Sequence, residues 1–152
     1  SSDARGQTIT LPAGFYSGVV CGFTCSNAGN ATLRIGPAGA SDATDLTTAY
    51  TEEVVVAVSP EATTAEYTFT FTEPLYLSGK YAIGLTGTGS INWRKAGTDA
   101  YAFGKPLGST TSNGWNMDIV ANDDKYFKMI GCSGTFAVNT GAAGKAAILF
   151  GP

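Results

Sequence analysis

The feature that most constrains this chain is the strict alternation of aromatic and threonine side chains between residues 67 and 72. Tyr67, Phe69 and Phe71 fall on one side of an extended strand, and the intervening threonines fall on the other. Because side chains alternate between the two faces of a β-strand, this pattern predicts a strand with one buried and one exposed face. A helix would distribute the three rings around its axis, so the segment favours a β-sheet.

Similar strand patterns recur along the chain, and no amphipathic helical pattern interrupts them. Turn-forming residues are expected to break the chain at 12–14, 73–74 and 78–79. About ten short strands separated by turns predict an all-β fold, an antiparallel two-sheet β-sandwich of jelly-roll type. The expected strands are 7–11, 15–25, 32–35, 47–58, 67–72, 75–77, 81–85, 91–93, 115–120, 125–132, 136–138 and 146–150.

The apolar positions within these strands indicate which side chains face the core. Between 15 and 25 the odd positions, beginning with Phe15, form the apolar face. The faces that carry Phe69 and Tyr81 are expected to turn inward. The three consecutive valines at 54–56 predict a strand that is buried on both sides.

The 152 residues fit one domain of ordinary size. We expect residues 1–140 to form the sandwich and residues 141–152 to add a Gly/Ala joint and a last apolar strand. Such a strand completes its own sheet or is exchanged with a neighbouring subunit by pairing with an exposed sheet edge. This predicted assembly strand consists of Ala146, Ala147, Ile148, Leu149 and Phe150.

The composition argues against two classes of partner. Charged residues make up only 14% of the chain and the net charge is −3, whereas binding to nucleic acid phosphates needs a surplus of Lys and Arg. No apolar run approaches the roughly 20 residues that a membrane-spanning helix requires. We therefore expect a soluble domain that binds neither nucleic acid nor membrane.

The chain has three cysteines and no histidine. Cys21 and Cys25 lie too far apart along one extended strand to bridge each other, since four residues span roughly 13 Å and a disulfide tolerates at most about 7 Å between Cα atoms. Cys132 pairing with one of them is the alternative. We favour three buried thiols that act as small apolar side chains.

Catalysis has few groups to use here. Without histidine there is no Ser-His triad, Cys-His pair or imidazole metal site. Asp118, Asp123 and Asp124 form the nearest carboxylate cluster, but acidic residues in β-turns usually bond their own backbone. We expect no enzymatic activity, no catalytic residue, no metal and no cofactor.

The middle of the chain resembles a known kind of module. In this region a strand ends in Pro, a Gly turn starts the next strand, and a Trp follows one hairpin later. The segments that carry the likeness are 69–75, 77–85, 89–93, 99–104, 114–115 and 124–128. This is similar to jelly-roll β-sandwich modules of secreted bacterial surface proteins and of phage decoration and fibre proteins, in the style of carbohydrate-binding modules. The likeness covers roughly 67–131. It implies a fold and a virion or extracellular setting, and no activity.

Four aromatic residues in or beside the stretch from 92 to 115 are the expected glycan-binding residues, because sugar rings stack on exposed aromatic faces. They are Trp93, Tyr101, Phe103 and Trp115. The alternative is that the two tryptophans cap the core where strands meet loops, since aromatic side chains dominate cores by area.

Two functions follow as hypotheses. The first is a non-enzymatic structural protein of a virion or extracellular assembly, of the phage capsid decoration or fibre type, which acts through contacts between subunits in a homo-oligomer or lattice. The second is a lectin-like carbohydrate-binding module of a secreted or virion protein. Both place the protein at a virion surface or outside the cell.

Overall fold

The computed structural model describes residues 4–97, 103–110, 114–121, 124–132 and 134–139. Within these residues the chain forms β-strands and no helix, and so no helix able to cross a bilayer. The strands are β1 (Arg5–Cys25), β2 (Gly29–Pro37), β3 (Thr44–Asp45), β4 (Glu52–Val58), β5 (Glu61–Gly87), β6 (Ile91–Trp93), β7 (Lys95–Gly97), β8 (Pro106–Ser109), β9 (Asn116–Ile119), β10 (Asp124–Lys125), β11 (Phe127–Gly131) and β12 (Gly134–Asn139).

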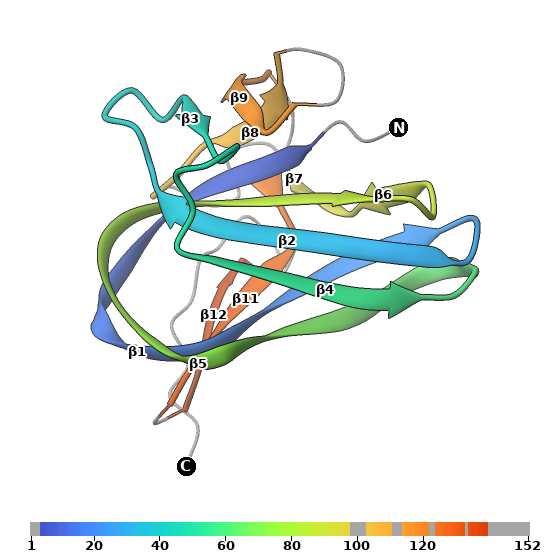
Figure 1. Ribbon diagram of the computed structural model, residues 1–152, viewed down its shortest axis with the longest axis horizontal. Coiled ribbons are helices and arrows are strands. Elements are labelled where there is room, and N and C mark those ends of the chain that lie inside the picture. The colour runs from blue at the N-terminus through green and yellow to red at the C-terminus, as the bar shows by residue number, and fades with distance from the viewer. Residues whose placement is uncertain (1–3, 98–102, 111–113, 122–123, 133, 140–152) are drawn as a thin grey trace.

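Two long strands, β1 and β5, organise the molecule. They pair antiparallel from Arg5 opposite Leu85 to Cys25 opposite Glu61, and Figure 1 shows both of them sweeping around the same curve. The first half of β1 also pairs with β8, whereas its second half pairs with β11 and β6. The later part of β5 carries β2, and β2 carries β4. The result is one antiparallel sheet that curls around its own inner face.

The long strands bend where the sequence predicted breaks. The register between β1 and β5 shifts between Leu11 and Gly14, and again between Tyr16 and Gly18. The predicted ends at 12–14, 73–74 and 78–79 are therefore wrong: these turn-forming residues lie in bulges and bends of continuous strands. A bulge inserts unpaired residues and increases the local twist, which lets proline and glycine sit inside a paired strand.

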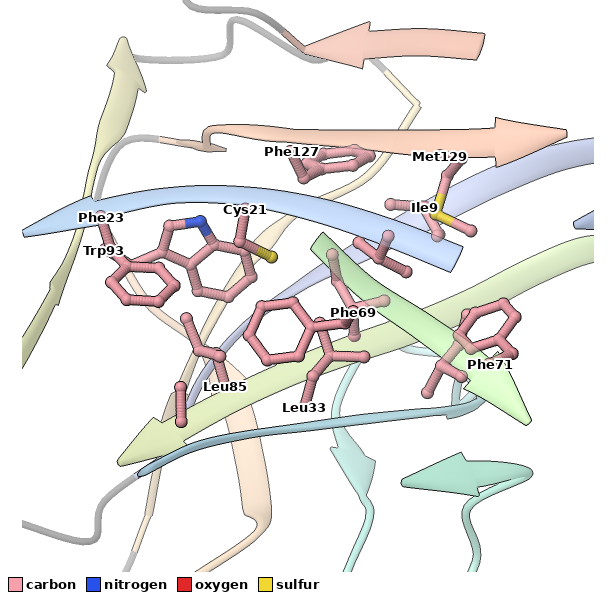
Figure 2. Packing of buried hydrophobic residues seen from close by; sticks show 14 of the residues in the cluster. Ile9, Cys21, Phe23, Leu33, Phe69, Phe71, Leu85, Trp93, Phe127 and Met129 are labelled. Carbon is pink, nitrogen blue, oxygen red and sulfur yellow. The ribbon is translucent and has the colours of Figure 1, made fainter. Parts of the chain in front are cut away.

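The inner face of the curled sheet holds the principal core. The alternation at 67–72 and at 81–85 is confirmed, because Phe69, Phe71, Ile83 and Leu85 are buried there. Figure 2 shows Phe69, Phe71 and Leu85 among side chains from β1, β2, β6 and β11. The buried members of the cluster are Ile9, Leu11, Tyr16, Val19, Cys21, Phe23, Cys25, Ala31, Leu33, Ile35, Val58, Phe69, Phe71, Leu77, Ile83, Leu85, Trp93, Phe127 and Met129.

Two predicted inward positions face solvent instead. Phe15 is 57% exposed and its neighbour Tyr16 is buried, because the bulge between Tyr16 and Gly18 reverses the alternation. Val55 is 53% exposed, and the valines on either side of it pack on the core. The run at 54–56 is thus buried on one side only, as expected for a strand at the margin of the sheet.

A second, smaller cluster covers part of the outer face of the sheet. It consists of Ala4, Leu46, Ala82, Leu107 and Met117, with Ala38 and Trp115 packed against it. Its residues come from β5, from the segment after β2, from β8, from β9 and the residue before it, and from the start of the described chain. The stretch from 95 to 114, in which no strand was expected, contributes the short strands β7 and β8.

The three cysteines are free thiols. Cys21 and Cys25 are buried, as predicted, and burial raises the pKa of the Cys21 thiol. Cys25 donates to the backbone oxygens of Asn27 and Gly89, at 2.8 and 3.1 Å. Cys132 is exposed, so the prediction of a third buried thiol is wrong. Its position at the end of β11 leaves the side chain outside both clusters.

All-β class and antiparallel pairing are confirmed. Of the described strands, ten belong to one connected sheet and only β7 and β10 form a separate two-stranded one. The curled sheet is compatible with a sandwich, and the division into two jelly-roll sheets stays a prediction.

Candidate functional site

The predicted aromatic residue Trp93 lies in the principal core. It is 4% exposed, and its indole Nε1 donates to the backbone oxygen of Tyr126 at 2.7 Å. Buried tryptophans usually find such a partner for their one polar group. Trp93 therefore joins β6 to the segment before β11, as the core-capping alternative predicted.

Trp115 lies on the other side of the sheet, beside the second cluster, over the glycine at position 84. The guanidinium carbon of Arg34 lies 4.5 Å from the centre of its ring and 4.3 Å from that of Tyr50. The Arg34 Nε donates to Glu53 at 2.6 Å, and Nη1 donates to the backbone oxygens of Leu46 and Thr47. This arginine thus fixes Trp115 and the segment before β4 to the sheet.

Phe103 is the predicted aromatic residue that faces solvent, at 62% exposed. Of the other predicted residues, Tyr101 and the assembly strand 146–150 lie outside the described residues. The structure does not bring Trp93 and Trp115 together, since they belong to different clusters.

Phe103 borders a shallow hollow that Thr10, Asp42, Lys80, Gly104 and Lys105 also line. Asp42 accepts hydrogen bonds from Lys80 Nζ and from the Thr8 hydroxyl, both at 2.8 Å. Burial alone would raise the pKa of Asp42, but these two donors lower it overall. The hollow thus combines an exposed ring with an ionised carboxylate and two ammonium groups.

Sequence reasoning missed this combination because the residues come from four separate segments. Asp42 also has a positive φ of 71°, a left-handed conformation that aspartate tolerates better than most residues. The segment around Asp42 is rich in Gly, Ala, Ser and Asp, which is typical of a loop. Nothing in the local sequence indicates that Asp42 lies beside Lys80.

The sheet has an open seam between β4 and the first part of β5, residues 61–72. Within the described chain, β4 pairs only with β2, and residues 61–72 pair only with β1. The two strands follow each other around the turn at 59–60 (Figure 1). Each therefore presents an edge without a strand partner. We call these two edges the β4–β5 seam.

Carboxylate side chains occupy main-chain donors at this seam. The Thr72 N–H donates to Glu52 Oε2 at 3.2 Å, and the Thr63 N–H donates to Glu61 Oε1 at 3.3 Å. Val54, Val56 and Tyr67 are partly buried along the same two strands and pack against the core. The seam therefore offers main-chain hydrogen bonds beside apolar side chains.

The carboxylates considered for catalysis lie in different environments. Asp118 is exposed and accepts a bond from the backbone of Ile119. Asp124 is buried and accepts a bond from Gln7 Nε2 at 3.0 Å. Asp123 lies outside the described residues. In the described chain no three metal-ligating side chains gather in one place.

Comparison with known proteins adds no relative. No protein-family model matches the chain, and neither the curated proteins nor the solved structures contain a match to it.

Proposed function

We propose that this protein is a non-enzymatic structural component of a virion or extracellular assembly, of the capsid decoration or fibre type. We also propose that its curled sheet is a two-sheet sandwich of jelly-roll type. The observation that carries the assembly proposal is the β4–β5 seam. An exposed edge with free main-chain groups is a template for an added strand.

The proposed occupant of the seam is the segment 146–150 of a second copy of the chain. Its sequence, Ala-Ala-Ile-Leu-Phe, is short, apolar and follows a Gly/Ala joint. Main-chain bonds would provide the affinity, and alternate side chains would extend the apolar contacts beside Val54 and Val56.

Charge complementarity supports the same occupant. The seam carries Glu52 and Glu61, whose carboxylates bond main-chain N–H groups. Such acidic side chains normally blunt an edge. The segment is preceded by Lys145, which would give a displaced carboxylate a new partner while the incoming strand takes over the main-chain donors.

A cross-linking experiment tests the exchange directly. One batch of chain carries Thr68→Cys in the seam, another carries Ile148→Cys, and both carry Cys132→Ser to remove the exposed native thiol. After mixing and mild oxidation, we expect a covalent dimer, because paired strands bring Cβ atoms within disulfide range. Thr110→Cys, exposed outside the seam, replaces Thr68→Cys as the control and should give no dimer.

Two results would overturn the assembly proposal. One is a wild-type chain that sediments as a monomer at every concentration tested. The other is rapid cross-linking within a single chain carrying both cysteines, with none between chains, which would make 146–150 a strand of its own sheet. We expect Ile148→Asp to shift the wild-type oligomer to monomer without loss of folding.

A second function, glycan binding, is favoured by the hollow beside Phe103. An exposed ring next to Asp42 and Lys80 offers stacking together with hydrogen-bond partners for sugar hydroxyls. A glycan array probed with wild type and Phe103→Ala tests it. Binding that Phe103→Ala abolishes in a folded protein supports this function, and an array without signal rejects it.

A further inference from the structure

A second hollow lies on the outer face of the sheet, where β1, β5 and β6 run side by side. Thr24, Thr64, Asn92, Trp93 and Arg94 line it with Lys95, and its volume is about 320 Å³, near the lower end of the range of small-ligand sites. Thr24 is directly opposite Asn92 in the β1–β6 register. Two hydroxyls and an amide therefore line one hollow.

Two adjacent cations border this hollow without a carboxylate partner. In the described part of the chain, neither Arg94 nor Lys95 has an ion pair, although Arg34, Lys80 and Lys128 each have one. Both side chains are exposed. In a protein of net charge −3, an uncompensated pair of cations on one small surface marks a place suited to a negatively charged group.

The carboxylate of Glu66, which bonds the Tyr126 hydroxyl, is already engaged. Glu66 Oε1 accepts bonds from Lys128 Nζ at 2.7 Å and from the Tyr126 hydroxyl. The hydrogen bond from Lys128 contributes most to lowering the pKa of Glu66, and that from Tyr126 adds to it. The negative charge of Glu66 is thus balanced by Lys128. Glu66 therefore does not compensate the positive charge of Arg94 and Lys95.

The Arg94 side chain is positioned by an aromatic ring. Its guanidinium carbon lies 5.6 Å from the centre of the Tyr126 ring, and that ring lies over the glycine at position 22. An arginine above a ring keeps its planar set of N–H donors free at the edge, where it can bond two oxygens of one anionic group.

We propose that this hollow binds an acidic saccharide. Arg94 and Lys95 hold the carboxylate or sulfate, and Thr24, Thr64 and Asn92 bond the ring hydroxyls. The polar row of hydroxyl and amide groups favours a saccharide over a bare anion, because a sugar uses those groups as well as the charge. The site shares no lining residue with the Phe103 hollow. It includes Thr64 of the first part of β5, but its occupation requires no strand exchange.

Calorimetric titration of the wild-type protein with sialyllactose, a sulfated disaccharide and lactose tests the inference. We expect one or both acidic sugars to bind and lactose to bind at least tenfold more weakly, because lactose lacks the negative group that would form charge-assisted bonds with Arg94 and Lys95. Affinity should fall as salt is raised. Arg94→Gln and Lys95→Gln should each weaken binding about tenfold, in proteins with unchanged unfolding curves.

Two control variants separate this site from the alternatives. Arg5→Gln removes an exposed cation elsewhere and should leave affinity unchanged. Phe103→Ala should also have no effect on acidic sugars. If Phe103→Ala abolishes binding and Arg94→Gln does not, the sugar occupies the other hollow and this inference fails. Equal binding of lactose, binding of sulfate alone with the affinity of the sugars, or preference for a phosphoserine peptide would each overturn it.

Discussion

The two arginines that lie against aromatic rings, Arg34 and Arg94, occupy contrasting environments. The guanidinium of Arg34 contacts two rings, an ion-paired carboxylate and two backbone oxygens, and its side chain is only 17% exposed. The guanidinium of Arg94 contacts the Tyr126 ring and has no ion pair among the described residues. Arg34 has Nε and Nη1 bonded inside the molecule, and Arg94 has an exposed side chain.

This difference separates structural from binding roles better than residue type does. An arginine that bonds to a carboxylate and to backbone oxygens holds its own surroundings together, so its removal should be detected as lost stability. An arginine with free donors costs little to remove from the folded state and should be detected through its ligand. The following predictions test that separation, beginning with the largest effect.

The largest effect is expected at Arg34. Arg34→Met keeps most of the apolar stem but leaves Glu53 and two backbone oxygens without their donor, so we expect the free energy of unfolding to fall by about 2–4 kcal/mol. Arg94→Met should change it by less than about 0.5 kcal/mol. Urea unfolding followed by tryptophan fluorescence measures both. Equal effects of the two substitutions would contradict the distinction.

A smaller effect is expected from the ring beside Arg34. Trp115→Leu removes the cation–π contact and part of the cover over the second cluster, which should lower the unfolding free energy by about 1–3 kcal/mol. In a chain that already carries Arg34→Met, Trp115→Leu should lower the unfolding free energy by less, because the two residues share one interaction. A double-mutant cycle measures that coupling, and full additivity would show that the contact contributes nothing.

Next comes the ring beside Arg94. Tyr126→Phe keeps the aromatic face and removes the hydroxyl that donates to Glu66. We expect a loss of about 1 kcal/mol in unfolding free energy and unchanged binding of the acidic sugar. If sugar binding fell as much as in Arg94→Gln, the Tyr126–Glu66 bond would be part of the binding site.

The smallest effect concerns pH. Hydrogen bonds from Lys128 and Tyr126 lower the pKa of Glu66 in the folded state. The contribution of Glu66 to stability is therefore complete above its pKa in the unfolded chain, about 4.3. It is lost as the pH falls through the lower pKa of the folded state. The Glu66 side chain is 46% exposed, so we expect less than about 1 kcal/mol. Glu66→Gln should flatten the acid limb of a stability–pH curve; an unchanged limb would contradict the assignment.

The sequence predicted the class of fold because alternation is a local property. The rings at 67–72 specify which face turns inward, and the structure buries Phe69 and Phe71 accordingly. The sequence pattern could not predict the length of β1 and β5, because proline and glycine occur both in turns and at bulges inside paired strands. The partner strand decides between them. The bulge beside Tyr16, which exposes Phe15, likewise has no signal in the local sequence.

The candidate sites were harder to predict for the same reason. The aromatic character of Trp93, Phe103 and Trp115 was visible, but their exposure depends on which strand or side chain covers each one. The row of Thr24, Thr64 and Asn92 comes from three segments that only the sheet brings together. The uncompensated charge at Arg94 likewise depends on which carboxylates other residues engage.

The long pairing of β1 with β5 also has a consequence for how the chain reaches its fold. The contact nearest in sequence joins Cys25 to Glu61, and the most distant joins Arg5 to Leu85. Closing the shorter loop costs less chain entropy, so pairing should start at the Cys25 end and advance toward Arg5. During synthesis the N-terminal half of β1 must then wait, unpaired, until residues 79–85 have emerged. It is therefore the stretch most exposed to wrong partners in that interval.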